Sequence, residues 1–114
     1  MAAALDVPVV AGESAYGVAG IRAIVEQRAA DVLMPDVQRM GGLTPWLAAA
    51  ALCEAHGLPV SNHLFHQVSG HGLCVCAQEP LAEVLPWETP FTDSTSVVNG
   101  ELVMGTAPGL GLSE

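Results

Sequence analysis

Apolar residues follow two alternating patterns along the first 85 positions of the chain. Short runs of aliphatic, often β-branched residues are typical of strands that are buried on both faces. Longer segments follow them, in which apolar residues recur three and four positions apart, as on one face of a helix. A connection between parallel strands needs about a dozen residues, so this alternation predicts an α/β fold with a parallel sheet. The predicted strands are residues 7–11, 31–34, 58–62 and 82–85, and the predicted helices are residues 18–29, 45–56 and 68–77.

The predicted helix at residues 45–56 has the clearest end signals. Thr44 is a favourable N-cap residue, and Pro45 suits the first helical position because its missing N–H has no helical partner there. Gly57 marks the end of the same helix. Gly70 and Gly72 weaken the next predicted helix, since glycine lowers helix propensity.

Turn-forming residues dominate the chain after Trp87. Residues 89–90, 92–94 and 99–100 are rich in Thr, Pro, Asp, Asn and Gly, which favour turns. The strand–helix pattern does not resume after them. We therefore expect two regions, a set of four βα units at residues 1–88 and an irregular C-terminal tail at residues 89–114.

The charge balance excludes several classes of partner. The chain carries 12 acidic residues against three arginines and no lysine, for a net charge of -9. Binding to nucleic acid or to an anionic membrane needs a basic patch that this composition does not supply. The longest apolar run, at residues 45–53, is much shorter than the roughly 20 residues that span a bilayer. The first residues lack the features of a secretory signal, so we expect a cytoplasmic protein.

The three cysteines, Cys53, Cys74 and Cys76, do not form a recognisable disulfide or zinc pattern. Their number is odd, they lack the spacing of a metal-binding pair, and they lie in apolar stretches. We predict buried free thiols, which fit a reducing compartment.

Polar residues follow or lie within the predicted strands at similar intervals. Glu13, Asp36, His63 and Glu83 are separated by 23, 27 and 20 residues, each about the length of one βα unit. The carboxyl ends of parallel strands meet at one edge of a sheet, where α/β proteins hold their active sites. We therefore expect these four side chains to lie near one another.

The four residue types suit a specific chemistry. A carboxylate behind an imidazole fixes its tautomer and raises its basicity, so Asp36 and His63 suit a general base or acid. Glu13 is a hard oxygen ligand of the kind that Mg²⁺ prefers. Glu83, if partly desolvated, would stay protonated and donate a hydrogen bond to an oxyanion.

Each site residue also has a simpler interpretation. Glu13 is compatible with a solvated loop, Asp36 with a turn, and His63 with a strand end that binds backbone. The other histidines have no assigned chemistry: His56 belongs at a helix C-terminus, where a cation complements the helix dipole, and His66 and His71 are structural or supporting residues.

Five ordered motifs resemble one known family. They are VAGES at residues 10–14, DVLMPD at 31–36, MGGLT at 40–44, SNHLF at 61–65 and PGLG at 108–111. Together they resemble the C-terminal part of the enolase superfamily, in its mandelate racemase group. The resemblance implies a modified (β/α)-barrel joined to a capping domain. It aligns this chain with the C-terminal half of the barrel, units five to eight, followed by a segment that returns toward the cap.

The resemblance also implies roles for the site residues. Glu13 matches the third Mg²⁺ ligand, Asp36 and His63 match the acid–base dyad, and Glu83 matches the acid that stabilises an enediolate. The shared reaction removes the proton α to a carboxylate, and the products form by reprotonation or by loss of water. Members that use a lysine at the sixth strand are excluded, because this chain contains no lysine.

Within the group that the sequence resembles, sugar-acid dehydratases outnumber racemases, so the resemblance favours Mg²⁺-dependent dehydration of an aldonate or aldarate. Two alternatives remain open: a mandelate-type racemase or epimerase, and a non-catalytic half-barrel assembly module. The earlier Mg²⁺ ligands and the lysine base of the family have no counterpart among these 114 residues. We accordingly expect the isolated chain to bind Mg²⁺ poorly, to be inactive, and to need either a second copy or an N-terminal half.

Overall fold

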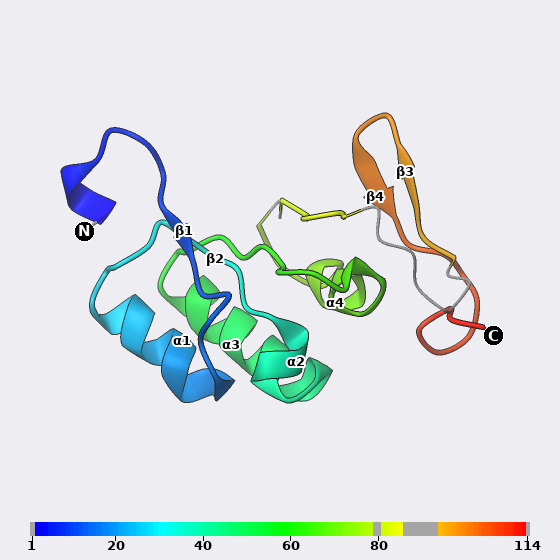
Figure 1. Ribbon diagram of the computed structural model, residues 1–114, viewed down its shortest axis with the longest axis horizontal. Coiled ribbons are helices and arrows are strands. Elements are labelled where there is room, and N and C mark those ends of the chain that lie inside the picture. The colour runs from blue at the N-terminus through cyan, green and yellow to red at the C-terminus, as the bar shows by residue number, and fades with distance from the viewer. Residues whose placement is uncertain (1, 79–80, 86–93, 114) are drawn as a thin grey trace.

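The computed structural model describes residues 2–78, 81–85 and 94–113. The α-helices of the described residues lie together in one part of the molecule, and a β-hairpin lies toward the other end (Figure 1). The helices at Gly17–Glu26 and Leu43–Ala55 pack against each other, and the strands at Val10–Ala11 and Val32–Leu33 lie above them in Figure 1. The elements are η1 (Ala2–Ala4), β1 (Val10–Ala11), α1 (Gly17–Glu26), β2 (Val32–Leu33), α2 (Val37–Met40), α3 (Leu43–Ala55), α4 (His66–Leu73), β3 (Ser96–Val98) and β4 (Glu101–Val103).

The predicted parallel arrangement is confirmed for the first three strand segments. β1 pairs with β2 in parallel, with Val10 opposite Val32. The third segment continues the same order through two isolated parallel bridges, Leu33 with Val60 and Asp36 with His63. The regular pairing is shorter than the predicted strands. The carboxyl ends of these three segments nevertheless lie at one edge.

The fourth predicted strand, at residues 82–85, is not a strand in the structure. Side chains of the third segment hold this stretch in place of a backbone ladder. The Ser61 hydroxyl donates to the Leu81 carbonyl at 2.6 Å. The Asn62 side-chain amide donates to the carbonyl of Glu83 at 3.1 Å and accepts from its N–H at 2.9 Å. The prediction was wrong because two polar side chains occupy the positions that a neighbouring backbone would take.

The helix predictions are correct in position and differ at the ends. α1 ends three residues before the predicted end. α3 begins at Leu43 with Gly42 as its N-cap, so the prediction of Thr44 as N-cap was wrong. Gly41 and Gly42 have φ values of 88° and 115°, which favour glycine, and the helix begins as soon as the chain leaves this conformation. α4 begins two residues before the predicted start and ends at Leu73.

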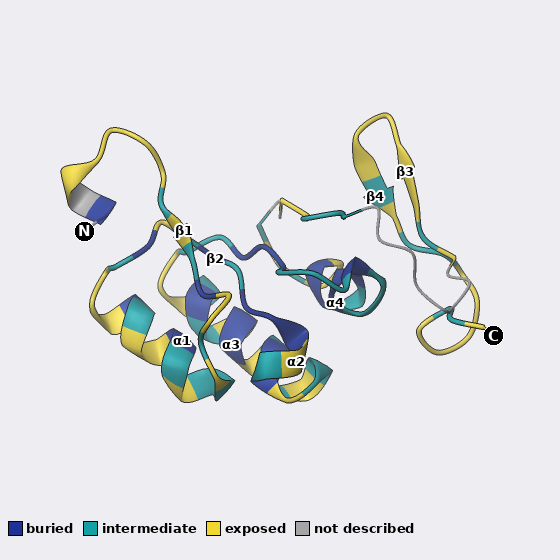
Figure 2. Ribbon diagram, viewed as in Figure 1, coloured by how far each residue is buried: buried dark blue, intermediate teal, exposed yellow. Residues whose placement is uncertain are grey.

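The core lies between α1, α3 and the strand segments, where buried residues face one another (Figure 2). Trp46 is fully buried at its centre, and its indole N–H donates to the Pro35 carbonyl at 2.9 Å. β1 was expected to be fully buried, but Val10 is 48% exposed. The expectation failed because β1 pairs only with β2 among the described residues. The buried apolar cluster comprises Ile21, Val25, Ala30, Leu33, Val37, Met40, Trp46, Ala49, Ala50, Cys53, Val60 and Leu73.

The tail is more regular than expected. β3 and β4 form an antiparallel hairpin around Asn99 and Gly100, which the sequence marks as a turn. Both turn residues have positive φ, 52° and 86°, as the tight turns that match strand twist require. The prediction of an irregular tail was therefore wrong over residues 96–103. It failed because strands of three residues are too short to show a recognisable alternation of apolar and polar residues. The turn residues predicted at 89–93 lie outside the described residues.

All three cysteines are free thiols, as predicted, but only Cys53 is buried. Burial, together with the nearby Cys76, raises the pKa of the Cys53 thiol to about 11, so it is protonated and unreactive at neutral pH. Cys74 is exposed because it lies at the C-terminal end of α4. No helix in the described ranges is long and apolar enough to cross a membrane.

The close contact of α4 with Trp46 gives a stability prediction. A Cβ added at Gly72 would lie 2.5 Å from the fully buried indole ring, whereas one added at Gly70 meets the flexible end of Met104. We expect Gly72→Ala to lower the free energy of unfolding by about 1–3 kcal/mol, as overpacking does. Gly70→Ala is the matched control, and we expect little loss because alanine favours the helix. Urea denaturation of both variants measures the difference, and equal stabilities would contradict it.

Candidate active site

Asp36 is the N-cap of α2, three residues after the end of β2, and its carboxylate is buried. One oxygen, Oδ1, accepts hydrogen bonds from the backbone N–H groups of Gln38 at 2.7 Å and Arg39 at 2.9 Å. Aspartate is a favourable N-cap residue because it satisfies N–H groups that have no partner within the helix. The carboxylate is thus fixed by the start of α2, a short helix that the sequence pattern did not predict.

The other Asp36 oxygen, Oδ2, lies 2.9 Å from Nδ1 of His63. The backbones of the two residues form a parallel bridge, and the His63 N–H donates to the Pro35 carbonyl. A carboxylate only accepts hydrogen bonds, so Nδ1 of His63 carries the proton. This leaves Nε2 as the nitrogen available for acid–base chemistry. The predicted contact between Asp36 and His63 is therefore present in the structure.

The surroundings of Asp36 shift its acidity. Burial acts to raise the pKa of the carboxyl group, but hydrogen bonds from the Arg39 N–H, His63 and the Gln38 N–H outweigh burial. The net result is a pKa below the ordinary aspartate value. Asp36 is therefore ionised at neutral pH, as an orienting partner for His63 requires.

Glu13 lies in the loop after β1, on the other side of the His63 ring. Its Oε2 is 3.6 Å from Nε2 of His63, and its side chain is 56% exposed. The Arg39 guanidinium donates to the Glu13 backbone carbonyl at 2.7 Å, which links this loop to α2. Sequence reasoning treated Arg39 only as a charge, and no signal in the sequence pointed to this contact.

Glu83 lies at the same edge and contacts Leu64, the residue that follows His63. Its Oε2 accepts a hydrogen bond from the Leu64 N–H at 2.7 Å. Glu83 is half-buried and lies in the stretch that Ser61 and Asn62 hold. The structure thus brings Glu13, Asp36 and His63 into contact and places the Glu83 carboxylate one residue away. That Glu83 donates a proton to an oxyanion stays a prediction.

The backbone after His63 is strained. Leu64 and Phe65 have φ values of 53° and 42°, in the left-handed region that side chains disfavour. Each such residue costs on the order of 1 kcal/mol or more and persists only where its surroundings hold it. Sequence reasoning missed this turn and also missed Asn62, whose buried amide contacts it.

The side chains of the site provide one suitable ligand for Mg²⁺, the carboxylate of Glu13. In the described ranges, no group of three or more His, Cys, Asp or Glu side chains is arranged to hold a metal ion. Glu13 suits a single position, because its exposed carboxylate lies at the carboxyl edge of the strands. Mg²⁺ requires near-octahedral oxygen coordination, so one carboxylate alone does not make a firm site.

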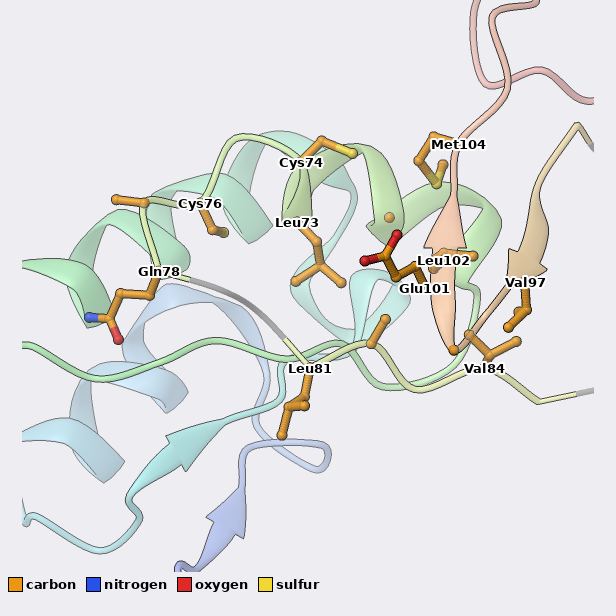
Figure 3. Close-up of a pocket in the computed structure, with 14 residues that line it drawn as sticks. Leu73, Cys74, Cys76, Gln78, Leu81, Val84, Val97, Glu101, Leu102 and Met104 are labelled. Carbon is orange, nitrogen blue, oxygen red and sulfur yellow. The ribbon is translucent and has the colours of Figure 1, made fainter.

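A pocket of about 700 Å³ lies elsewhere, between α4, residues 76–78 and 81–84, and the hairpin. Figure 3 shows mainly apolar side chains around it, with Glu101 among them. None of Glu13, Asp36, His63 and Glu83 lines this pocket. The candidate active site is therefore the open strand edge and not this pocket.

Comparison with known proteins decides the family. The model of the enolase C-terminal domain-like family matches residues 1–113. The chain belongs to this family. The enolase-type resemblance of the sequence motifs is thereby confirmed, together with an α/β fold of helices and parallel strands.

Two solved structures and one curated relative of this enolase C-terminal domain-like chain are informative. A mandelate racemase/muconate lactonizing enzyme from Polaromonas sp. JS666 has a TM-score of 0.93 and 35% identity, over 98% of this chain and 31% of that one. L-talarate dehydratase from the same source, complexed with Mg and L-glucarate, has a TM-score of 0.92 and 35% identity, over 98% and 30%. L-talarate/galactarate dehydratase from Salmonella typhimurium is 29% identical over 114 residues. The chain spans 29% of that relative's length.

The lowered pKa of Asp36 predicts how stability depends on pH. The folded state binds the proton less tightly than the unfolded state, so the ionised carboxylate stabilises the fold above pH 3.8, the ordinary value. This contribution is lost as the pH falls below that value, through the lower pKa of the folded protein. We expect Asp36→Asn to make acid unfolding less steep below about pH 4. Urea titrations at several pH values measure this, with Asp6→Asn as the control for net charge. A variant with the parent's steepness would contradict the assignment.

Proposed function

We propose that this chain is the part of a Mg²⁺-dependent acid-sugar dehydratase that carries the acid–base dyad. The observation that carries the proposal is the 2.9 Å contact between Asp36 and His63 at the ends of adjacent parallel strands. Relatives at 29% and 27% identity are L-talarate/galactarate dehydratase and D-xylonate dehydratase, which supports a sugar acid as the substrate class.

In this reaction a base from another segment would take the proton from the α carbon, and the β hydroxyl leaves as water after it receives a proton from His63. Nε2 of His63 is the group that delivers a proton to the departing hydroxyl, while Asp36 stabilises the positive charge that the ring carries before transfer. Proton transfer from a neutral ring would leave an imidazolate, so His63 acts in its protonated form. When the ring is neutral, Nε2 can instead accept a proton and act as a general base.

The two glutamates have supporting roles in the proposal. Glu83 lies beside the residue that follows His63 and contacts the substrate carboxylate, where negative charge develops. Glu13 holds one position of a bound Mg²⁺. The ion supplies positive charge that makes the α proton of the substrate more acidic.

The proposal assigns residues 1–88 to units five to eight of a (β/α)-barrel and residues 89–114 to the tail. The coverage supports a match to part of a longer barrel, because this chain aligns with about 30% of the length of the solved relatives. A complete barrel takes about 250 residues. The remaining Mg²⁺ ligands and a second base must then come from another segment, either an N-terminal half or another copy of the chain.

A chimera tests the proposed function. The aligned segment of the Salmonella L-talarate/galactarate dehydratase is replaced by this chain, and release of keto acid from galactarate is measured with Mg²⁺ present. We expect dehydration by the chimera. His63→Asn should lower kcat by about 100-fold or more, because general acid–base catalysis contributes about 10²–10⁴-fold.

His56→Asn is the matched control, since His56 lies at the exposed end of α3 and should leave the rate unchanged. A folded chimera that keeps its rate after His63→Asn would contradict the proposal. Exchange of the α proton with solvent without loss of water would favour the racemase alternative. A folded chimera without either reaction would favour the non-catalytic assembly module.

The single carboxylate gives a prediction for metal binding. We expect calorimetric titration of the 114-residue chain with Mg²⁺ to show no saturation at concentrations that saturate the chimera, because Mg²⁺ needs several oxygen ligands. In the chimera, Glu13→Gln should weaken Mg²⁺ binding, whereas Glu26→Gln, on the exposed face of α1, should not. Tight, saturable binding to the chain alone would show that the site is complete without further ligands.

A further inference from the structure

The Asn62 side chain is buried next to the site, and its amide nitrogen and its oxygen both have hydrogen-bond partners. It is 0% exposed and directly precedes His63. Its Nδ2 donates to the Leu64 carbonyl at 3.0 Å and to the Glu83 carbonyl at 3.1 Å. Its Oδ1 accepts from the Glu83 N–H at 2.9 Å. One amide group therefore contacts both the residue after His63 and the proposed substrate-binding acid.

Two of these hydrogen bonds reproduce what a neighbouring strand provides. A backbone ladder would donate to the Glu83 carbonyl and accept from its N–H, and Asn62 does both with its side chain. Residues 81–85 form no strand, so this side chain stands in for the ladder at Glu83. The main chain of Glu83 is consequently fixed relative to the third segment.

The same hydrogen bonds form a closed ring. The Glu83 carboxylate accepts from the Leu64 N–H, and the Leu64 carbonyl accepts from Asn62. Leu64 and Phe65 both have left-handed φ values, which require a surrounding that holds them. The ring supplies partners for both the N–H and the carbonyl of Leu64. The Ser69 hydroxyl also donates to the Leu64 carbonyl at 3.2 Å, on the side of α4, so the ring links the strained turn to the Glu83 carboxylate and Ser69 links it to α4.

We propose that Asn62 is a positioning residue for Glu83. It fixes the Glu83 carboxylate beside His63 by anchoring the Glu83 main chain and the Leu64 turn together. What Glu83 then does to a substrate rests on the proposed function, but the positioning itself does not. No member of the ring needs a metal ion or a substrate for its contacts.

Amide hydrogen exchange of the 114-residue chain, followed by NMR, tests this role. The Leu64 amide reports the bond to Glu83, and the Met34 amide, which donates to Ala11 in the parallel sheet, reports the fold. We expect Asn62→Ala to reduce the protection of Leu64 about tenfold or more relative to Met34. Ser61→Ala is the matched control. It removes the neighbouring bond to Leu81, and the ratio should stay within about twofold of the parent's.

Asn62→Asp is a second variant, which keeps the size of the side chain and its acceptor but removes both Nδ2 donors. It should also lower the protection of Leu64 relative to Met34. Unchanged protection of Leu64 in both variants would overturn the proposal. Loss of protection at Leu64 and Met34 together in both variants would make Asn62 merely structural and would overturn it as well. Neither result depends on the chimera, so the proposed function stands or fails separately.

Discussion

The geometry of the site depends on the buried Asp36 carboxylate, because each of its two oxygens binds a different partner. Oδ1 of Asp36 caps α2, and Oδ2 holds the His63 ring. Because the hydrogen bonds of the cap hold the carboxylate in place, the imidazole is oriented by a partner that has little freedom to move. Because the same hydrogen bonds favour ionisation, the local fold and the electrostatics of the site have one cause.

Polar side chains also hold the next stretch of the chain along this edge of the sheet. The stretch at residues 81–85 is held through Ser61 and Asn62 instead of through regular strand pairing. A buried amide that is fully hydrogen-bonded is favourable, whereas the same amide with a missing partner is costly. This makes the arrangement specific: a small change in the Glu83 main chain would leave buried polar groups unpaired.

The sequence predicted the three parallel strand segments and the positions of the three long helices, because apolar periodicity reports which face is buried. It also predicted the contact between Asp36 and His63, since residues one βα unit apart emerge at the same edge. It failed where local bonds replace regular structure. The start of α3 follows from the conformation of Gly41 and Gly42, and the short α2 follows from the cap by Asp36.

The sequence by itself determined the family, the order of the first three strand segments and of the three longer helices, and the residue types of the site. Those features follow from periodicity and from motifs that are contiguous in the chain. Only the tertiary structure decided that Arg39 holds the Glu13 loop, that Asn62 holds Glu83, and that Leu64 adopts a strained turn. The reason is physical: these contacts join residues that are distant in sequence or depend on side-chain direction, and no periodic pattern records either.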